Sequence, residues 1–253
     1  MKVLNQRSAL KGSPKISKPV MKLSIVMPVY NEGAIINKTI TSLEMSTKVP
    51  HELIIVYDME SDTTIDPVKK LQKRYKNTKL LKNKYGKGAL NALKTGLECA
   101  RGNAVCVMMA DLTDDPMVIN EMMKKFNQGF DIIAASRYMK GGHQKGGPVL
   151  KQLLSRCAGL SLYYLAGLPT HDATNSFKIY SKKFLRHTKI ESDGGFELGI
   201  ELTVKGHFSG YKVTEVPTTW TYLSKESRFY LKKWLPKYVK WYFFALKKRY
   251  NLS

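Results

Sequence analysis

The sequence predicts an α/β fold built on a mixed, mostly parallel sheet with helices on both faces. Apolar, β-branched runs alternate along the chain with segments whose apolar residues recur at helical spacing. The runs are apolar throughout, which is typical of strands buried on both faces. A length of 253 residues allows one large domain with a substantial core and is short for two independent domains.

Five apolar strands and four helices are expected in the first part of the chain. The strands are LSIVMPVY, ELIIVYD, the shorter TKLLKN, AVCVMMAD, which ends at Asp111, and DIIAASR, which ends at Arg137. The helices follow the first four strands, in NEGAIINKTITSL, from Pro67 to Tyr75, in KGALNALKTGLECARG and in PMVINEMMKKFNQG. Pro116 near the start and Gly129 past the end delimit the fourth helix.

The part of the chain after Arg137 is expected to be less regular. YMKGGHQKGGP is rich in glycine and predicts a mobile loop. It precedes a helix in VLKQLLSRCAGLSLYYLAGLP, then a loop, strand and turn in HDATNSFKIYSKKF, and a helix in GGFELGIELTVKGH. YKVTEVPTTW predicts an edge strand that ends at Pro217.

Positive charge is concentrated at the two ends of the chain. Lys and Arg number 42 against 20 Asp and Glu, a net charge of +22 that favours nucleic acid, a phosphorylated ligand or an anionic membrane as partner. We expect a flexible basic tail at 1–22, one domain at 23–222 and a basic, aromatic region at 223–253. The middle is only moderately basic, which argues against a nucleic-acid groove through the core.

The cysteines and the hydropathy indicate a cytoplasmic protein. Cys99, Cys106 and Cys157 are widely spaced, which predicts neither a disulfide framework nor a zinc site and favours a reducing compartment. We find neither the apolar core of a signal peptide nor an apolar stretch long enough to span a bilayer, so we expect a chain that does not cross a membrane.

Polar residues follow several of the predicted strands, where open sheets of this kind bind ligands. They are Tyr30-Asn31-Glu32, Asp58, Asp111 and Arg137. Burying the Asp111 carboxylate is costly without a cation or hydrogen-bond donors. We interpret it as a metal or ligand carboxylate, the alternative being a cap of the next helix, for which Thr113, Asp114 and Asp115 are better placed. Hard oxygen ligands favour Mg²⁺ or Mn²⁺ bridging phosphates.

Three other positions at this edge could contact a ligand, and two of them, Asp58 and Arg137, leave a second interpretation open. Asp58 could accept hydrogen bonds from a base or ribose, or cap the turn at Ser61-Asp62. Lys87 and Gly88 open a helix and could present amides to a phosphate. Arg137 could form a phosphate fork or a surface ion pair.

Six segments in order resemble the family 2 glycosyltransferases of the dolichol-phosphate mannose synthase type. They are LSIVMPVYNE, LIIVYD, the strand ending in Asp111 with Pro116 beyond it, ASRYMKGG, HDATNSFKIYSKK and EVPTTW. The resemblance covers roughly residues 22–228. It implies a GT-A fold, a GDP- or UDP-sugar as donor, a divalent metal and inverting transfer, commonly to a polyprenyl phosphate.

The resemblance also implies roles for individual donor-side residues. Nucleotide contacts fall on Pro28, Tyr30, Asn31 and Glu32, and base or ribose recognition falls on Asp58. Asp111 matches the second aspartate of the family's Asp-x-Asp motif, whereas Met109 replaces the first. Thr113 stands where the synthases often have glutamine, and Tyr57 replaces another common acid. The metal shell must therefore be completed by donor phosphates, water, Thr113 or one of Asp114 and Asp115.

On the acceptor side, the resemblance implies that Arg137 acts at the diphosphate or at the acceptor phosphate, and Asp172 matches a family aspartate. An acceptor phosphate is already anionic near neutral pH, because its second pKa is about 6, so no strong general base is needed. We hypothesise that Asp111 places the metal on the donor diphosphate. Arg137, with Arg228 or Lys225 from a closing loop, then neutralises the incoming phosphate.

The C-terminal segment predicts an amphipathic helix after Pro236 that lies on the cytosolic face of an anionic membrane. One stripe is apolar and the opposite face carries lysines, while Trp234 and Trp241 suit headgroup depth. The alternative is a helix docked on the domain core. Two rival functions remain: a catalytically impaired, nucleotide-binding relative, which Met109 makes credible, and a basic nucleic-acid-binding α/β protein.

Overall fold

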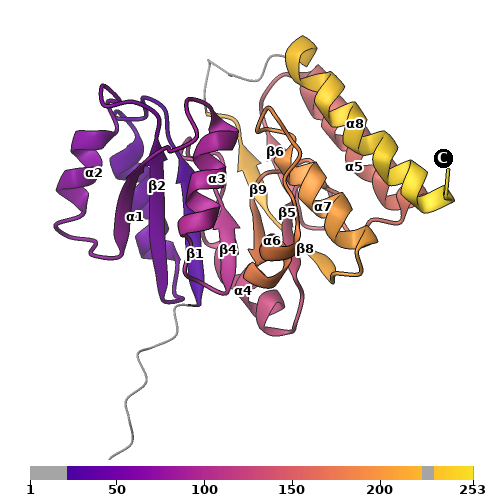
Figure 1. Cartoon of the computed structure of the whole chain (residues 1–253), viewed down its shortest axis with the longest axis horizontal. Helices are drawn as coiled ribbons and strands as arrows, with labels where there is room; N and C mark the ends of the chain where they lie inside the picture. The colour runs from indigo at the N-terminus through magenta and orange to yellow at the C-terminus, as the bar shows by residue number, and fades with distance from the viewer. Residues whose placement is uncertain (1–21, 224–230, 253) are drawn as a thin grey trace, which may run out of the picture.

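The computed structural model describes residues 22–223 and 231–252, and the side chains of all these except 231 and 232. A main sheet has the strand order β3-β2-β1-β4-β7-β5-β8, and a second sheet pairs β6 with β9 (Figure 1). The strands are β1 (Leu23–Pro28), β2 (His51–Tyr57), β3 (Thr78–Lys82), β4 (Ala104–Val107), β5 (Ile132–Ser136), β6 (His143–Lys145), β7 (Lys178–Ser181), β8 (Val213–Pro217) and β9 (Thr219–Thr221). The helices are α1 (Ile36–Ser46), α2 (Ile65–Leu71), α3 (Ala89–Cys99), α4 (Val118–Asn127), α5 (Val149–Ala166), α6 (Lys182–His187), α7 (Leu198–Phe208) and α8 (Leu231–Tyr250).

The direction of the strands determines where their polar ends meet. β1 is parallel to β2 and β4, β2 is parallel to β3, and β5 is parallel to β8. β7 lies antiparallel between β4 and β5. The carboxyl ends of β1, β2, β4 and β5 therefore point to one edge of the sheet, and the predicted mixed, mostly parallel sheet is confirmed.

Apolar cores cover both faces of the sheet. Ile25 and Met27 belong to the core with α1, α2 and α4, whereas Val26 belongs to the core with α3, α6 and α7. A Cβ on Gly96 of α3 would lie 2.3 Å from Cγ1 of Val26, so glycine is what allows this helix to approach β1. Both faces are buried, as the uninterrupted apolar runs predicted.

Several element boundaries differ from those expected. β4 ends at Val107, four residues before Asp111, because its pairing with β1 and β7 stops there. The glycine-rich stretch expected to be a mobile loop contains β6, which pairs with β9 in the register Gln144 to Trp220. The turn expected after β7 is instead the helix α6, whose first turn Ser181 caps by accepting a hydrogen bond from the Phe184 amide. β8 is an edge strand that ends at Pro217, as predicted.

The C-terminal helix α8 runs through Pro236 and packs beside α5 and α7 (Figure 1). Trp234 is 8 % exposed and Trp241 is 2 % exposed, so the prediction that both lie at headgroup depth is wrong for this conformation. The face of α8 that carries the two indole rings packs against the protein, as in the alternative interpretation of a helix docked on the domain core. No helix in the described ranges combines the length and the hydropathy needed to span a bilayer. The predicted basic tail lies outside those ranges, except for Lys22.

Candidate active site

The segment after β1 is fixed to the loop that follows β2. The Asn31 amide donates to Oδ1 of Asp62 at 3.1 Å, and the Glu32 amide donates to Oγ1 of Thr64 at 2.9 Å. The Thr63 amide in turn donates to Oδ1 of Asn31 at 3.2 Å. The expected nucleotide-contacting residues that follow Pro28 are thus held at the sheet edge by their own backbone.

Asp58, at the end of β2, ties that strand to the start of α3. Its Oδ1 accepts from the Asn83 side chain at 2.7 Å, and its Oδ2 accepts from the Gly88 amide at 2.9 Å. The Gly88 amide is therefore engaged and does not point at a phosphate here, contrary to the expectation for this turn. The Ser61-Asp62 turn is capped by Asp62 itself, whose Oδ1 accepts from the Thr64 amide, so Asp58 is not that cap. Lys87 is exposed beside this turn.

Asp111 organises the turn that follows β4. Its Oδ1 accepts hydrogen bonds from the amide of Thr113 at 3.2 Å and from the Thr113 hydroxyl at 2.7 Å. The intervening Leu112 has a φ of 61°, a left-handed conformation that is strained for a side chain of this kind. Asp115, one of the expected caps, is exposed and accepts from the Met117 amide at 2.9 Å, in the turn that leads into α4. No described side chain caps α4 itself, whose N-cap residue is Met117, so Asp111 holds its own turn and is not a helix cap.

Asp114, which was expected to be a cap, is buried instead. It is 6 % exposed, and its Oδ1 has no hydrogen-bond partner within residues 22–223 and 231–252. Burial, and then the charge of Asp111, raise the pKa of the Asp114 carboxyl to about 8. The backbone of residues 113 and 114 is held from the far side by β9, through the Thr221 amide and a bridge to Trp220.

Arg137 and Asp172, which lie far apart in the sequence, form a two-pronged buried pair. Nε of Arg137 donates to Oδ2 of Asp172 at 2.7 Å, and Nη2 donates to Oδ1 at 2.9 Å. The Arg137 amide also donates to Oδ2. Burial opposes ionisation of Asp172, but the charge and hydrogen bonds of Arg137 outweigh it and lower the pKa of the carboxyl. The pair is buried, which removes the surface ion pair as an interpretation of Arg137.

Sequence reasoning missed the groups that support this pair. Lys178 on β7 is fully buried, and its Nζ donates to the backbone carbonyls of Asp172, Ala173 and Asn175. Glu215 on β8 accepts from the amide and from Nδ1 of His171, at 2.8 and 2.5 Å. A lysine inside an otherwise apolar strand was the one available signal, because lysine is rarely buried without partners.

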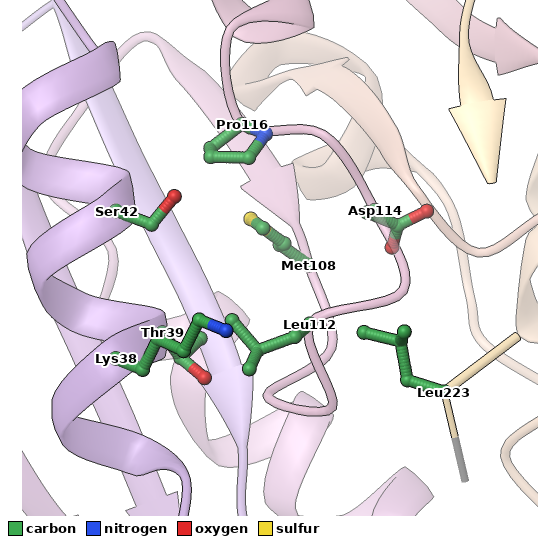
Figure 2. A pocket seen from close by; sticks show the side chains of 8 residues that line it. All are labelled: Lys38, Thr39, Ser42, Met108, Leu112, Asp114, Pro116 and Leu223. Carbon is green, nitrogen blue, oxygen red and sulfur yellow. The ribbon is translucent and has the colours of Figure 1, made fainter. Parts of the chain in front are cut away.

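A cavity of about 220 Å³ opens beside the Asp111 turn (Figure 2). Its walls are Lys38, Thr39, Ser42, Met108, Leu112, Asp114, Pro116 and Leu223. In Figure 2 the α1 side chains form one wall, and the Asp114 carboxylate points away from it, toward the side of Leu223. The expected donor-contacting residues Tyr30 and Asp58 and the expected phosphate ligand Arg137 do not line this cavity, which is mainly apolar.

The oxygen ligands present suit a hard divalent cation that is bound mainly by phosphate and water. The part of the chain that the structure describes contains no cluster of three or more His, Cys, Asp or Glu side chains that could hold a metal. Asp111 is half-buried, and Oδ1 alone is engaged in its hydrogen bonds with Thr113. Mg²⁺ commonly keeps several waters and few protein ligands, so this set fits Mg²⁺ or Mn²⁺ better than zinc. Lys225 and Arg228, expected on a closing loop, lie outside the described residues.

The sequence of residues 24–188 matches the family described as Glycosyl transferase family 2. The chain belongs to this family. It is 29% identical over 204 residues to the dolichol-phosphate mannosyltransferase of Pyrococcus furiosus, covering 79% of this chain and 56% of that protein. It is 29% identical over 223 residues to the uncharacterized glycosyltransferase YkcC of Bacillus subtilis, covering 85% and 65%. The chain thus spans less than two thirds of the length of either relative.

Solved structures share the fold of this chain. Glucosyl-3-phosphoglycerate synthase from Mycobacterium tuberculosis, in complex with Mn²⁺, UDP and glucosyl-3-phosphoglycerate, superimposes with a TM-score of 0.65 at 16% identity. The match covers 92% of this chain and 81% of that protein. The same synthase in complex with Mg²⁺ and UDP gives a TM-score of 0.63. The predicted GT-A fold is confirmed, and the predicted enzyme class is confirmed at the level of the family.

Proposed function

We propose that this chain transfers a sugar, with inversion, from a GDP- or UDP-sugar to a polyprenyl phosphate at the cytosolic face of a membrane. The observation that carries the proposal is the meeting, at one sheet edge, of a carboxylate turn at Asp111 and a buried arginine at Arg137. The carboxylate serves the donor diphosphate through a metal, and the arginine serves the second phosphate.

The donor side is supported by the order of the loops after β1, β2 and β4. Residues 30–32 are held by residues 62–64, and Asp58 fixes the turn before α3, so the wall of a nucleotide site is formed before any ligand arrives. The fold relative binds UDP with Mn²⁺ or Mg²⁺. In this chain Asp111, with Thr113, would hold such a cation, which supplies positive charge to the leaving diphosphate.

The acceptor side is supported by the pairing of Arg137 with Asp172. The fork fixes the guanidinium plane and keeps it charged in a buried setting, where a cation stabilises an anion more strongly than in water. The Arg137 guanidinium also lies 6.0 Å from the centre of the Trp220 ring, on the strand that holds the Asp111 turn. Arg137 is therefore placed to receive an anionic acceptor without a general base.

A lipid acceptor is supported by an apolar surface on two neighbouring helices. On α8, Leu235, Val239 and Phe243 follow one another at one-turn spacing and are 39–55 % exposed. On α5, Val149 and Leu153 are also exposed, and the two helices lie side by side (Figure 1). Exposed lysines flank this surface on α8: Lys233, Lys240, Lys247 and Lys248. An apolar stripe bordered by cations favours insertion into an anionic bilayer surface.

The proposal is tested by incubating the protein with labelled GDP- and UDP-sugars, Mn²⁺ and polyprenyl phosphate in vesicles, and by measuring organic-extractable label. We expect transfer from one nucleotide class, and a loss of about 100-fold or more in Asp111→Asn, in line with the removal of a group that stabilises transition-state charge. Donor binding without transfer to any acceptor would instead favour the catalytically impaired relative. Full turnover by Asp111→Asn would contradict the proposed site.

The membrane part of the proposal has its own test. The triple variant Leu235→Ser, Val239→Ser and Phe243→Ser should lose co-sedimentation with vesicles that contain anionic lipid, because each substitution removes buried apolar area at the interface. Met45→Ser on α1 is the matched control, since Met45 is 78 % exposed and lies on another element. Equal sedimentation of the triple variant and the control would contradict docking by this surface.

A further inference from the structure

The turn at residues 111–114 contains a buried carboxylate without a hydrogen-bond partner in the described structure. Oδ1 of Asp114 is inaccessible to solvent, and no donor within residues 22–223 and 231–252 reaches it. The other buried aspartate of this region, Asp172, has its oxygens saturated by hydrogen bonds. An unpaired buried carboxylate is strongly disfavoured unless a cation or a proton joins it.

The described cations near Asp114 already have other partners. Within residues 22–223 and 231–252, Arg137 and Lys178 are the two cations whose charges act on Asp114. Arg137 directs Nε and Nη2 at Asp172, and Lys178 directs Nζ at three backbone carbonyls. The described contacts include no hydrogen bond from either cation to Asp114, so no described side chain compensates a charge on it by direct contact.

Asp111, three residues earlier in the same turn, makes the deficit larger. Its negative charge opposes ionisation of Asp114, so the two carboxylates could both be charged here only with a cation between them. One divalent cation shared by the two carboxylates would remove both the unpaired burial and the repulsion. Asp115 does not compete for this role, because it is exposed and accepts a hydrogen bond from the Met117 amide.

We propose that Asp114 is a ligand of the divalent cation and supplies the carboxylate that the Asp-x-Asp motif lacks at Met109. The motif is then completed from its carboxyl-terminal side, by Asp111 and Asp114, instead of from its amino-terminal side. This inference rests on the proposed use of a metal-bound nucleoside diphosphate. It deepens that proposal by naming a ligand outside the motif.

The test is the affinity of the full chain for Mn²⁺, measured by electron paramagnetic resonance of free Mn²⁺, with UDP or GDP present and with neither. We expect Asp114→Asn to weaken Mn²⁺ binding by about 10- to 100-fold or more, the range seen when even groups supporting a metal are removed. Asp115→Asn is the matched control, because the asparagine oxygen can accept the same hydrogen bond from the Met117 amide, and its Mn²⁺ affinity should equal that of the wild type.

Thermal unfolding without metal separates a ligand from a merely structural residue. Asp114→Asn removes a carboxyl whose ionisation is opposed by burial and whose Oδ1 has no described partner, so the metal-free variant should melt at or above the wild-type temperature while it loses the rise in Tm that Mn²⁺ with nucleotide produces. A lower Tm in the metal-free variant together with unchanged Mn²⁺ affinity would overturn the assignment. That combination would give Asp114 an ordinary place in the core.

A rescue variant makes the assignment sharper still. Met109→Asp installs the missing motif carboxylate, and in the Asp114→Asn background it should restore at least part of the Mn²⁺ affinity, whereas Met109→Asn should not. If Asp114→Asn binds Mn²⁺ with UDP or GDP as tightly as the wild type does, the assignment of Asp114 fails and the proposed donor chemistry stands. Should the wild type bind no Mn²⁺ with either nucleotide, the proposed donor chemistry fails with it.

Discussion

The loops at residues 108–116 and 170–175 each bury an aspartate near the same guanidinium, yet they treat it in opposite ways. Asp172 accepts hydrogen bonds from the amide, Nε and Nη2 of Arg137, and also from Thr174 and Asn175. Oδ1 of Asp114 accepts none from the described residues. Burial by itself raises the pKa of either carboxyl. At Asp172 the charge and the hydrogen bonds of Arg137 outweigh burial and lower the pKa, whereas the pKa of Asp114 stays raised.

The difference distinguishes a support from a ligand site. The polar groups of the 170–175 loop find partners within the protein. Lys178 on β7 donates to the Ala173 carbonyl, and Glu215 on β8 accepts from the His171 amide. The 108–116 loop holds Leu112 in a left-handed conformation and leaves a buried oxygen without a partner. Strain and missing partners persist only where the surrounding structure enforces them, and such positions cluster at binding sites. The 170–175 loop therefore holds the side chain of Arg137 in place, whereas the 108–116 loop has the features of the metal site that we propose.

Removing Asp172 should have the largest effect on stability. Asp172→Ala leaves the Arg137 guanidinium buried without its carboxylate, which costs about 3–5 kcal/mol in the free energy of unfolding. Urea denaturation followed by circular dichroism measures this loss. The double variant Asp172→Leu and Arg137→Met is the control: it should recover much of the stability and none of the transfer activity. A loss below about 1 kcal/mol for Asp172→Ala would show that the pair is not the support inferred here.

Arg137→Lys should have the next largest effect, and mainly on function. Lysine keeps the charge but cannot make the planar fork, so we expect a loss of about 1.5–3 kcal/mol in unfolding free energy, the worth of one hydrogen bond between charged groups. Transfer to a phosphate acceptor should fall further than stability does, because the cation is no longer held in one orientation. Equal activity of the two proteins at saturating acceptor would contradict the role given to the fork.

The sequence could predict the two residues of this pair but not that they meet. Arg137 follows an apolar strand and Asp172 lies in a polar loop, and nothing in hydrophobic periodicity reports a contact across 35 residues of chain. Periodicity located the buried strands, because burial on both faces leaves a pattern in each segment by itself. It could not give the end of β4, which depends on where its neighbours β1 and β7 stop pairing.

Tertiary contacts also explain the other departures from expectation. Trp234 and Trp241 are residues typical of an interfacial helix. Their large apolar rings are equally suited to packing against a neighbouring element, and in the structure they are buried in this way. Asp58 and Gly88 were each given a possible ligand, and in the structure the Gly88 amide donates a hydrogen bond to Asp58. In both cases a side chain or amide that could contact a membrane or a ligand contacts instead a part of the protein that is distant in sequence. Only the folded structure shows that contact.

The pH dependence of stability should sharpen the contrast from the side of Lys178. Burial lowers the pKa of this lysine to about 7, below the value near 10.5 of an exposed lysine. Between these two pH values the unfolded chain binds more protons than the folded chain, so the contribution of Lys178 to stability rises with pH. The difference in unfolding free energy between the wild type and Lys178→Met should therefore grow from pH 7 to 9. A constant difference would mean that the three carbonyls keep the amine protonated.

Asp115→Ala should have the smallest effect, and it isolates what is special about its neighbour. Asp115 is exposed and makes a single hydrogen bond to the Met117 amide, so its removal should cost about 0.5–2 kcal/mol in unfolding free energy, with little change for Asp115→Asn. Urea denaturation without metal measures both values. Asp114→Asn, one residue away, is expected to leave the stability of the metal-free protein unchanged or to raise it, because it removes a buried carboxyl whose Oδ1 has no partner among the described residues. If Asp115→Ala and Asp114→Asn destabilised the metal-free protein equally, Asp114 would be a structural residue of the turn. The proposed difference between Asp114 and Asp172 would then be wrong.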